Sequence, residues 1–155
     1  MAKEFEDYFS EYQTDMVSIA LEYADGRADE IFIYGACEDG TTAFDVFYRI
    51  NGKIVEKDNL NSAVVSGISA YDTSGERQSA MLNIGLDNLD NIEAKCGEFH
   101  REMPTEIRLH YDVKNNKMRA KYRYDRIFSE HADILPDDVF DTWLQSVSNG
   151  EPPLG

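Results

Sequence analysis

The side chains of this sequence that could do chemistry are mostly carboxylates. The chain has 30 Asp and Glu residues among 155, and clustered carboxylates can bind a divalent cation or transfer protons during hydrolysis. Short clusters occur at Glu38-Asp39, at Asp87 and Asp90, and at Asp137, Asp138 and Asp141. In so acidic a sequence such groupings also arise by chance. A small acidic metal-dependent hydrolase that uses a carboxylate cluster is therefore only the alternative function.

The histidines and cysteines show no pattern of a metal site or an activated nucleophile. His100, His110 and His131 lack the i, i+4 spacing of a helical metal site, and His110 alternates onto the solvent side of a predicted strand. Cys37 and Cys96 belong to no CxxC motif and lie among apolar residues, which predicts two buried free thiols. No phosphate-binding glycine loop or nucleophile elbow is present. We therefore predict no catalytic residue, metal or cofactor, and a protein that is not an enzyme.

The charge of the chain limits its possible partners. The net charge is −15, and residues 101–126 hold eight Lys or Arg against four Asp or Glu, which leaves 7 basic and 26 acidic residues elsewhere. Such a field repels nucleic acids and anionic membranes and attracts basic proteins. Acidity that serves solubility alone is the simpler alternative. The acidic N-terminus does not resemble a signal peptide and no stretch is long enough to span a membrane, so we expect a cytoplasmic protein.

The elements that must position these residues can be read from the spacing of apolar side chains. Spacings of three and four predict helices over residues 3–24, 76–99 and 136–147, and a period of two or a short apolar run predicts strands over 30–37, 42–50 and 53–55. Asn51-Gly52 predicts a tight hairpin turn, and Thr73 and Glu76 stand at capping-box spacing. Residues 57–72 fit neither period, and we expect an irregular connection there with room for a short helix. Residues 148–155 are expected to fray.

Residues 105–125 predict a further β-hairpin with two different faces. Its apolar residues should form the sheet face on which the helices pack: Ile107, Leu109, Tyr111, Met118, Tyr122 and Tyr124. The opposite face is basic, with Lys117, Arg119, Lys121 and Arg123. A nucleic-acid platform is one interpretation, but the tyrosines alternate to the other face and the remaining charge opposes phosphates. We expect a solvated face that pairs with neighbouring acids and discourages edge-to-edge aggregation.

Together these elements predict one α+β domain over residues 1–147. An antiparallel sheet of about five strands should carry a long N-terminal helix, a middle helix and a C-terminal helix, because helices and strands occur in separate runs rather than in strict alternation. Before the C-terminal helix, Leu135 is a poor cap, so we expect Asp137 or Asp138 to accept hydrogen bonds from the free amides there.

Several segments together resemble the YezG-like immunity protein family. They are EYQTDMVSIALEYAD near the start, FDVFYRINGKIV, PTEIRLHYDVKNNKMRAKYRYD and PDDVFDTW, and the resemblance runs from about Glu11 to Val147. It implies a small cytosolic α+β antitoxin without enzyme activity. The family's partner is the nuclease toxin domain of an LXG-type protein exported by the type VII secretion system. Residues 61–71 and Leu135 depart from the family pattern.

Charge and resemblance suggest the same function, which is stoichiometric binding of a basic nuclease toxin domain. The acids with the highest local density near helix ends are the predicted partner-binding residues: Asp87, Asp90, Asp137, Asp138 and Asp141. No nucleic acid or membrane is expected as a partner. The sequence leaves open a homo-oligomer, including a housekeeping component with no toxin partner.

Overall fold

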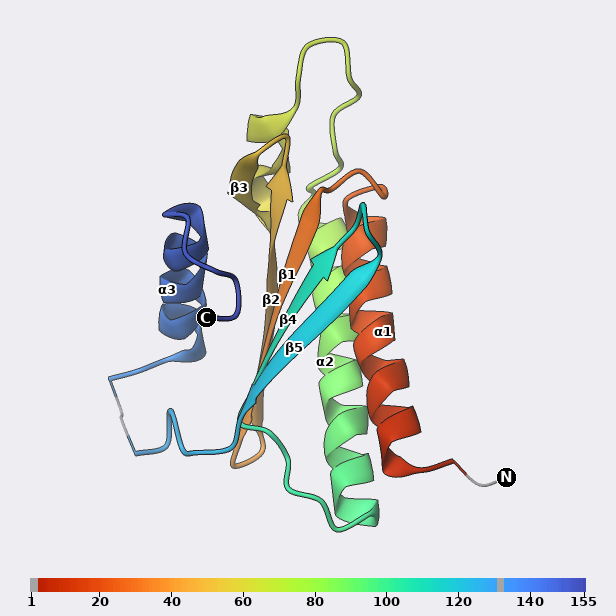
Figure 1. The fold of residues 1–155 in the computed structure, drawn as a ribbon, viewed down its shortest axis with the longest axis vertical. Coiled ribbons are helices and arrows are strands. Elements are labelled where there is room, and N and C mark those ends of the chain that lie inside the picture. Colours follow the sequence, from red (N-terminus) through yellow and green to blue (C-terminus); the bar gives the residue numbers. More distant parts are fainter. Residues whose placement is uncertain (1–2, 131–132) are drawn as a thin grey trace.

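The structure is a computed structural model, and it describes residues 3–130 and 133–155. In chain order its elements are α1 (Phe5–Tyr23), β1 (Glu30–Glu38), β2 (Thr41–Ile50), β3 (Lys53–Glu56), the 3-10 helix η1 (Lys57–Ala63), α2 (Gly75–Glu98), β4 (Glu106–Asp112), β5 (Lys117–Arg123) and α3 (Pro136–Ser148). The strands form one antiparallel sheet in the order β3-β2-β1-β4-β5. Helices α1 and α2 cover one face and α3 covers the other (Figure 1). The predicted α+β fold is confirmed.

Strand β1 is the centre of the sheet, as its apolar sequence predicts. It pairs with β2 on one side and β4 on the other, and it is buried on both faces. Ile31 and Ile33 belong to the core beneath α1 and α2. Phe32 and Tyr34 belong to a second, smaller core beneath α3. Because successive strand residues point to opposite faces, one short apolar run supplies both cores.

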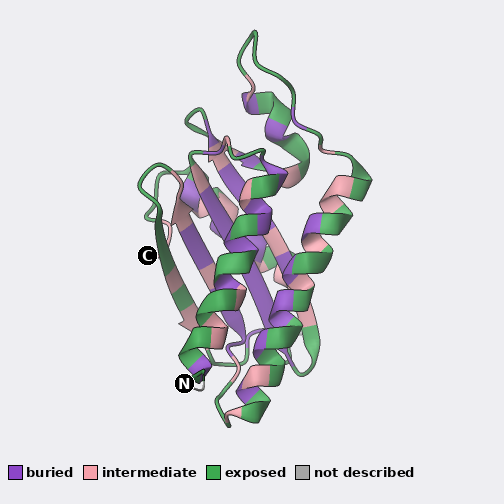
Figure 2. Cartoon of the chain, turned by 90° about the vertical axis from the view of Figure 1, so that its right-hand side faces the viewer, coloured by how far each residue is buried: buried purple, intermediate pink, exposed green. Residues whose placement is uncertain are grey.

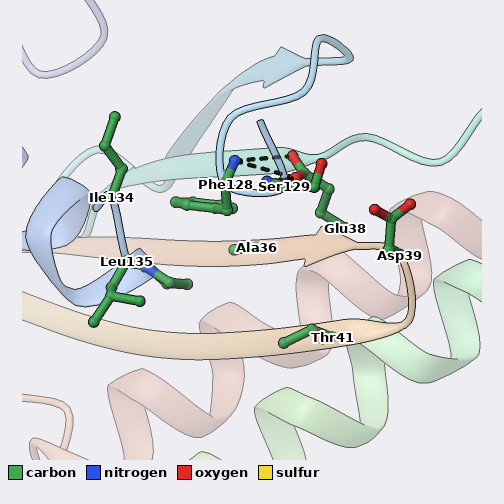
Figure 3. Close-up of a pocket in the computed structure, with 9 residues that line it drawn as sticks. Ala36, Glu38, Asp39, Thr41, Phe128, Ser129, Ile134 and Leu135 are labelled. Atoms are coloured by element: carbon green, nitrogen blue, oxygen red, sulfur yellow. Dashed lines mark hydrogen bonds between the residues drawn. The ribbon is translucent and has the colours of Figure 1, made fainter. Parts of the chain in front are cut away.

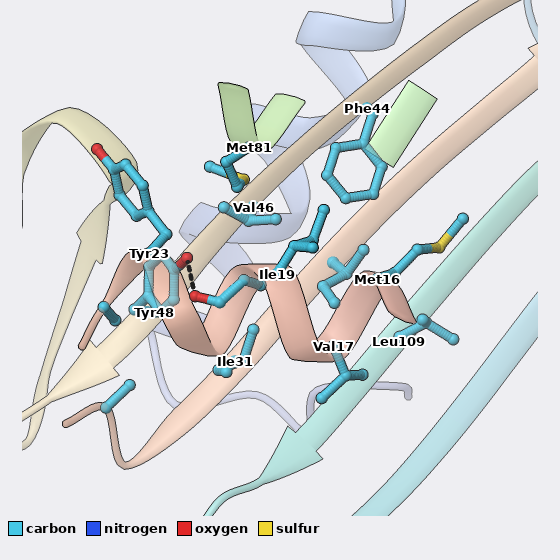
Figure 4. Close-up of a cluster of buried hydrophobic side chains, with 14 of the residues drawn as sticks. Met16, Val17, Ile19, Tyr23, Ile31, Phe44, Val46, Tyr48, Met81 and Leu109 are labelled. Atoms are coloured by element: carbon cyan, nitrogen blue, oxygen red, sulfur yellow. Dashed lines mark hydrogen bonds between the residues drawn. The ribbon is translucent and has the colours of Figure 1, made fainter. Parts of the chain in front are cut away.

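The larger core joins the two long helices to the sheet. Figure 4 shows Met16 and Ile19 of α1 among residues of the strands beneath it. In this core the Tyr48 hydroxyl donates a 2.7 Å hydrogen bond to the backbone carbonyl of Ala20 on α1. Figure 2 shows that α1 and α2 turn their buried stripes to the sheet and their exposed residues outward. The helices therefore form an outer layer whose solvent side is polar.

The connections follow the turn chemistry of the sequence. Asn51 and Gly52 both have left-handed backbone angles, with φ of 50° and 80°, as a two-residue turn between β2 and β3 requires. Residues 57–63 form η1, which lies within the stretch predicted to be irregular. The cap of α2 differs from the prediction: Ser74, not Thr73, accepts the 3.3 Å hydrogen bond from the backbone amide of Arg77.

Helix α2 comes unusually close to β2 at Gly85. A Cβ atom added to Gly85 would lie 2.2 Å from two ring carbons of Phe44. Only glycine leaves room for that ring at this point. Gly85 is buried on the side of the helix that faces the sheet, and the Phe44 ring gives the reason.

The predicted hairpin is present as β4 and β5, with one correction to its faces. Ile107 and Leu109 are buried in the larger core, and the Tyr122 hydroxyl donates a 2.9 Å hydrogen bond to the side-chain oxygen of Gln13 on α1. Met118 and Tyr124, which we predicted in the core, are 38% and 46% exposed. They lie near the two ends of the edge strand.

Helix α3 is capped as predicted, because the Asp138 side chain accepts a 3.0 Å hydrogen bond from the Leu135 amide. The chain after α3, for which we predicted fraying, lies against the helix. The indole nitrogen of Trp143 donates a 2.7 Å hydrogen bond to the carbonyl of Pro153. Leu154 packs against the smaller core. These contacts place residues 153–154 beside the buried face of α3.

Candidate functional site

The five predicted partner-binding aspartates are all exposed, but they lie in two places. Asp87 and Asp90 are on α2, whereas Asp137, Asp138 and Asp141 are on α3. Because these helices cover opposite faces of the sheet (Figure 1), the structure does not bring the five residues onto one surface. The two groups therefore have different surroundings.

Two of the α3 residues lie in a larger acidic group that we name the α3–β3 acidic patch. Its members come from α3, β2, β3 and η1: Asp45, Glu56, Asp58, Asp137 and Asp141. Partial desolvation and the charges of Asp58, Asp141 and Asp45 raise the pKa of Glu56. Burial and the charge of Asp137 raise the pKa of Asp45, against the opposing effect of Lys57. Mutual repulsion is therefore built into this patch.

The patch has little compensating positive charge of its own. The ammonium nitrogen of Lys57 lies 2.9 Å from a carboxylate oxygen of Asp45. No ion pair between described residues involves the other four members of the patch. A cationic partner would relieve the repulsion, so this surface is suited to bind one.

Asp138 faces a different environment from its two neighbours on α3. It lines a groove of about 490 Å³ beside Arg108 and Trp143. The guanidinium carbon of Arg108 lies 5.2 Å from the centre of the Trp143 ring. With its carboxylate engaged by the Leu135 amide, Asp138 serves mainly as the cap of α3.

The α2 pair lies in a layer whose acids are partly neutralised. Arg101 lies 2.9 Å from Glu6, and Lys95 lies 2.8 Å from Glu98. Beside Asp87, the side-chain amide of Asn88 donates a 2.7 Å hydrogen bond to Asp15. This face is acidic too, but basic residues are interspersed along it.

Glu38 and Asp39, the remaining predicted acidic cluster, are occupied by protein donors. The buried carboxylate of Glu38 accepts hydrogen bonds from the amides of Phe128 and Ser129 (Figure 3). It also accepts one from the amide of Ile127. Burial raises the pKa of Glu38, but these hydrogen bonds outweigh it and lower the pKa to about 2. A carboxylate held in this way is a poor proton donor or general base near neutral pH.

The adjoining pocket has a volume of about 250 Å³. Figure 3 shows its lining, in which the carboxylate of Asp39 lies at the rim beyond Glu38. Apolar side chains of Phe128, Ile134 and Leu135 form much of the wall, and Leu135 is 59% exposed. Asp39 itself pairs with Arg126 at 2.9 Å. The pocket offers shape and apolar contact rather than a reactive pair of carboxylates.

His110 was predicted on a solvent-facing strand surface, and this prediction is wrong. Its side chain is 7% exposed, stacks on Phe32 at 5.1 Å between ring centres, and lies 2.6 Å from a carboxylate oxygen of Glu30. The other oxygen of Glu30 accepts from Arg49. The alternation was read correctly, but α3 and the residues beneath it bury much of the face to which His110 points.

The basic face of the hairpin is not neutralised as we expected. Among the described residues, Arg123 pairs with Asp125 at 2.6 Å, whereas Lys117, Arg119 and Lys121 form no ion pair. These three side chains are exposed. Our prediction that these cations pair with neighbouring acids is therefore wrong for three of the four.

The remaining candidates for chemistry are the cysteines and the other two histidines. Cys37 and Cys96 are buried free thiols, as predicted, and burial with the nearby Glu93 raises the pKa of Cys37 to about 12. His100 is exposed with a left-handed φ of 55°, and His131 lies outside the described residues. Within residues 3–130 and 133–155, no three His, Cys, Asp or Glu side chains converge as a metal site requires. No described helix is long and apolar enough to cross a membrane.

Sequence reasoning missed three members of the acidic patch. Asp45, Glu56 and Asp58 lie far from Asp137 in the sequence, and only the packing of α3 over β2 and β3 brings them together. The sequence did contain part of the information needed to find these residues. The Asn51-Gly52 turn sets a register in which Phe47 pairs with Glu56, so Glu56 had to share a sheet face with Asp45.

Comparisons with known proteins give this site no precedent, because no protein-family model matches the chain and no curated protein matches it either.

Proposed function

We propose that this chain is a cytoplasmic immunity protein that binds a basic nuclease toxin domain in a stoichiometric complex and thereby neutralises it. The α3–β3 acidic patch is the observation that carries the proposal. Five carboxylates from four elements meet there, and Lys57 is the one cation paired with any of them among the described residues. The resemblance of several segments to the YezG-like immunity family supports the same class of partner.

The physical basis is electrostatic complementarity. A nuclease must be positively charged where it holds phosphates, so the patch can compete for that surface. Long-range attraction from a chain of net charge −15 accelerates the encounter. Fast capture matters for an antitoxin, because the toxin has to be bound before it reaches nucleic acid. Binding alone suffices, and no catalytic group of this chain is needed.

The patch also explains why a partner should gain affinity there. Burial, together with repulsion from neighbouring carboxylates, raises the pKa of Glu56 and of Asp45, so the free protein holds these charges at a cost in stability. Contact with Lys or Arg would remove that cost and add charge-assisted hydrogen bonds. The adjoining residues of α3 present a rigid surface, because Trp143 and Phe140 anchor the helix in the smaller core.

The direct test is co-expression with the nuclease domain encoded beside this gene. We expect cells to survive and the two proteins to purify as a complex of fixed stoichiometry. The proposal would be contradicted if cells survived no better than with the nuclease alone and the two proteins did not co-purify. A catalytically inactive nuclease variant serves as the control for complex formation without toxicity.

The position of the binding surface can be tested with matched variants. Asp137→Asn with Asp141→Asn removes two charges from the patch, and Asp87→Asn with Asp90→Asn removes two from α2. We expect the first pair to weaken protection and the second to leave it intact. The opposite outcome would show that the binding surface lies on the α1–α2 layer.

A further inference from the structure

Strand β5 ends the sheet and leaves one edge without a partner. It pairs with β4 alone, so alternate backbone amides and carbonyls point away from the sheet. The opposite edge is different, because β3 has four residues and packs against η1. Strand β5 has seven residues, none of them proline or fully buried, and Figure 2 shows no buried segment along this edge. The edge has the length to accept another strand, and the C-terminal Gly155 approaches it at Lys121, where a Cβ atom added to Gly155 would lie 3.3 Å from the ammonium nitrogen.

The register of the hairpin gives the cations of β5 different neighbours on the inner side: Lys117 lies opposite Asp112 and Arg123 lies opposite Glu106. Arg119 lies opposite His110, and Lys121 lies opposite Arg108. The nearest carboxylates are already engaged: Glu30 with His110 at 2.6 Å and Glu106 with Arg108 at 2.7 Å. Pairs of like sign are unfavourable directly across a sheet. Arg119 and Lys121 therefore have no carboxylate directly opposite on β4 and can meet a cross-strand carboxylate only on the outer side.

Protection against aggregation does not by itself account for this choice of residues. Charges on an edge strand hinder self-pairing, but Asp or Glu would do this as well, and the chain has twice as many acidic as basic residues. Positive charges repel a second β5 while attracting an acidic strand. They thus give the edge a selectivity that a merely protective charge does not need.

We propose that the β5 edge binds an extended segment of a partner protein that carries Asp or Glu at alternate positions. The segment adds a sixth strand to the sheet, its backbone bonding to β5 and its carboxylates facing Lys117, Arg119 and Lys121. This surface lies at the opposite end of the strand order from the α3–β3 acidic patch and has the opposite charge. The inference goes beyond the proposed function and does not depend on the partner being a nuclease.

Two other occupants fit less well. A second copy joined through β5 would place cations against cations on the same sheet face. Single-stranded nucleic acid needs aromatic rings for stacking, but Tyr122 turns to α1, where its ring lies 5.3 Å from that of Phe9. The net charge of −15 further opposes a polyanion, whereas a short acidic peptide brings few charges.

The test uses synthetic peptides as long as β5 with blocked ends. One has the sequence Thr-Glu-Val-Glu-Val-Glu-Thr, a second has Lys in place of each Glu, and a third is the Glu peptide with alternate backbone nitrogens methylated. Fluorescence anisotropy measures their binding to the full chain, and amide hydrogen exchange locates it. We expect the Glu peptide to bind about tenfold more tightly than either control and to slow exchange within residues 117–123.

Charge reversal on β5 makes the test specific to this edge. The double variant Arg119→Glu with Lys121→Glu should reverse the preference, binding the Lys peptide more tightly than the Glu peptide. The matched control is Lys53→Glu on β3 at the other edge, which should leave the preference unchanged. A reversal of preference cannot arise from misfolding, which would abolish both interactions.

Several results would overturn the inference. They are equal binding of the Glu and Lys peptides, no binding of any peptide, or exchange protection that lies outside β5. A dimer in sedimentation analysis that the double variant abolishes would assign the edge to a second copy. Tighter binding of a short single-stranded oligonucleotide than of the Glu peptide would assign it to nucleic acid.

Discussion

At the scale of single residues, Glu38 shows how one carboxylate can hold a long connection in place. Its two oxygens accept hydrogen bonds from the backbone of Ile127, Phe128 and Ser129, which belong to the segment between β5 and α3. We expect Glu38→Gln to lower the free energy of unfolding by about 2 kcal/mol at pH 7, because a neutral amide accepts fewer and weaker bonds. Urea denaturation measures this. The control Asp39→Asn, at an exposed pair with Arg126, should cost much less.

The same residue predicts a pH dependence with a definite sign. The folded-state pKa of Glu38 is about 2, below the ordinary value of 4.5. The stabilisation from Glu38 is therefore fully present above pH 4.5 and declines as the pH falls towards 2. The stability difference between the wild type and Glu38→Gln should shrink over that range in acid denaturation. A difference that stays constant down to pH 2 would show that charge plays no part in the contact.

Tyr122 and Arg119 test the assignment of faces on β5. The Tyr122 ring packs on Phe9 and its hydroxyl bonds to Gln13, whereas Arg119 is exposed and has no ion pair among the described residues. We expect Tyr122→Asp to lower the free energy of unfolding by about 3 kcal/mol and Arg119→Ser to change it by less than about 0.5 kcal/mol. Thermal and urea denaturation compare them. Equal losses would mean that the faces are assigned wrongly.

At the scale of elements, the contact between α2 and β2 depends on Gly85. We expect Gly85→Ala to destabilise the fold by about 2 kcal/mol, because its methyl group would overlap the ring of Phe44. Gly97, on an open part of the same helix, is the matched control. Gly97→Ala should stabilise by about 0.5 kcal/mol through helix propensity. If both variants gain stability, the approach of α2 to β2 is looser than the structure shows.

Most elements could be predicted from sequence because their signals are local. Alternation defines β2 and the hairpin, the spacing of apolar residues defines α1 and α2, and Asn51-Gly52 fixes a register. The position of α3 could not be predicted in this way. Its amphipathic stripe shows that Trp143 is buried but not against which face of the sheet. That choice brings Asp137 near Asp45, so the candidate site depended on it.

At the scale of the whole molecule, charge is distributed unevenly across the sheet. The α3–β3 acidic patch lies near one end of the strand order and the cations of β5 lie at the other. Of the five residues predicted to bind a partner, Asp137 and Asp141 belong to the patch, Asp138 caps α3, and Asp87 and Asp90 lie on the other face. Their role in binding stays a prediction. Local density in sequence cannot distinguish these cases, because the decisive neighbours come from β2, β3 and η1.

The patch predicts opposite effects of one substitution on stability and on binding. Glu56 has a raised folded-state pKa, so its ionisation disfavours the folded state, and the penalty appears as the pH rises through that pKa. We expect Glu56→Gln to stabilise the free protein by about 0.5 kcal/mol at pH 7 and to have little effect at pH 3. The same change should slow association with the nuclease domain. Destabilisation at pH 7 would show that the repulsion is already relieved.

The measurement that tests the central claim most directly is the rate of association with the nuclease toxin domain that we propose as the partner, which we expect to be encoded beside this gene, by stopped-flow fluorescence at increasing salt. We predict a complex whose association rate falls steeply with salt for the wild type. Asp137→Asn with Asp141→Asn should slow the reaction about threefold or more at low salt and flatten its salt dependence, and Asp87→Asn with Asp90→Asn should do neither. No complex, or a rate that neither salt nor the α3 variant changes, would contradict the account.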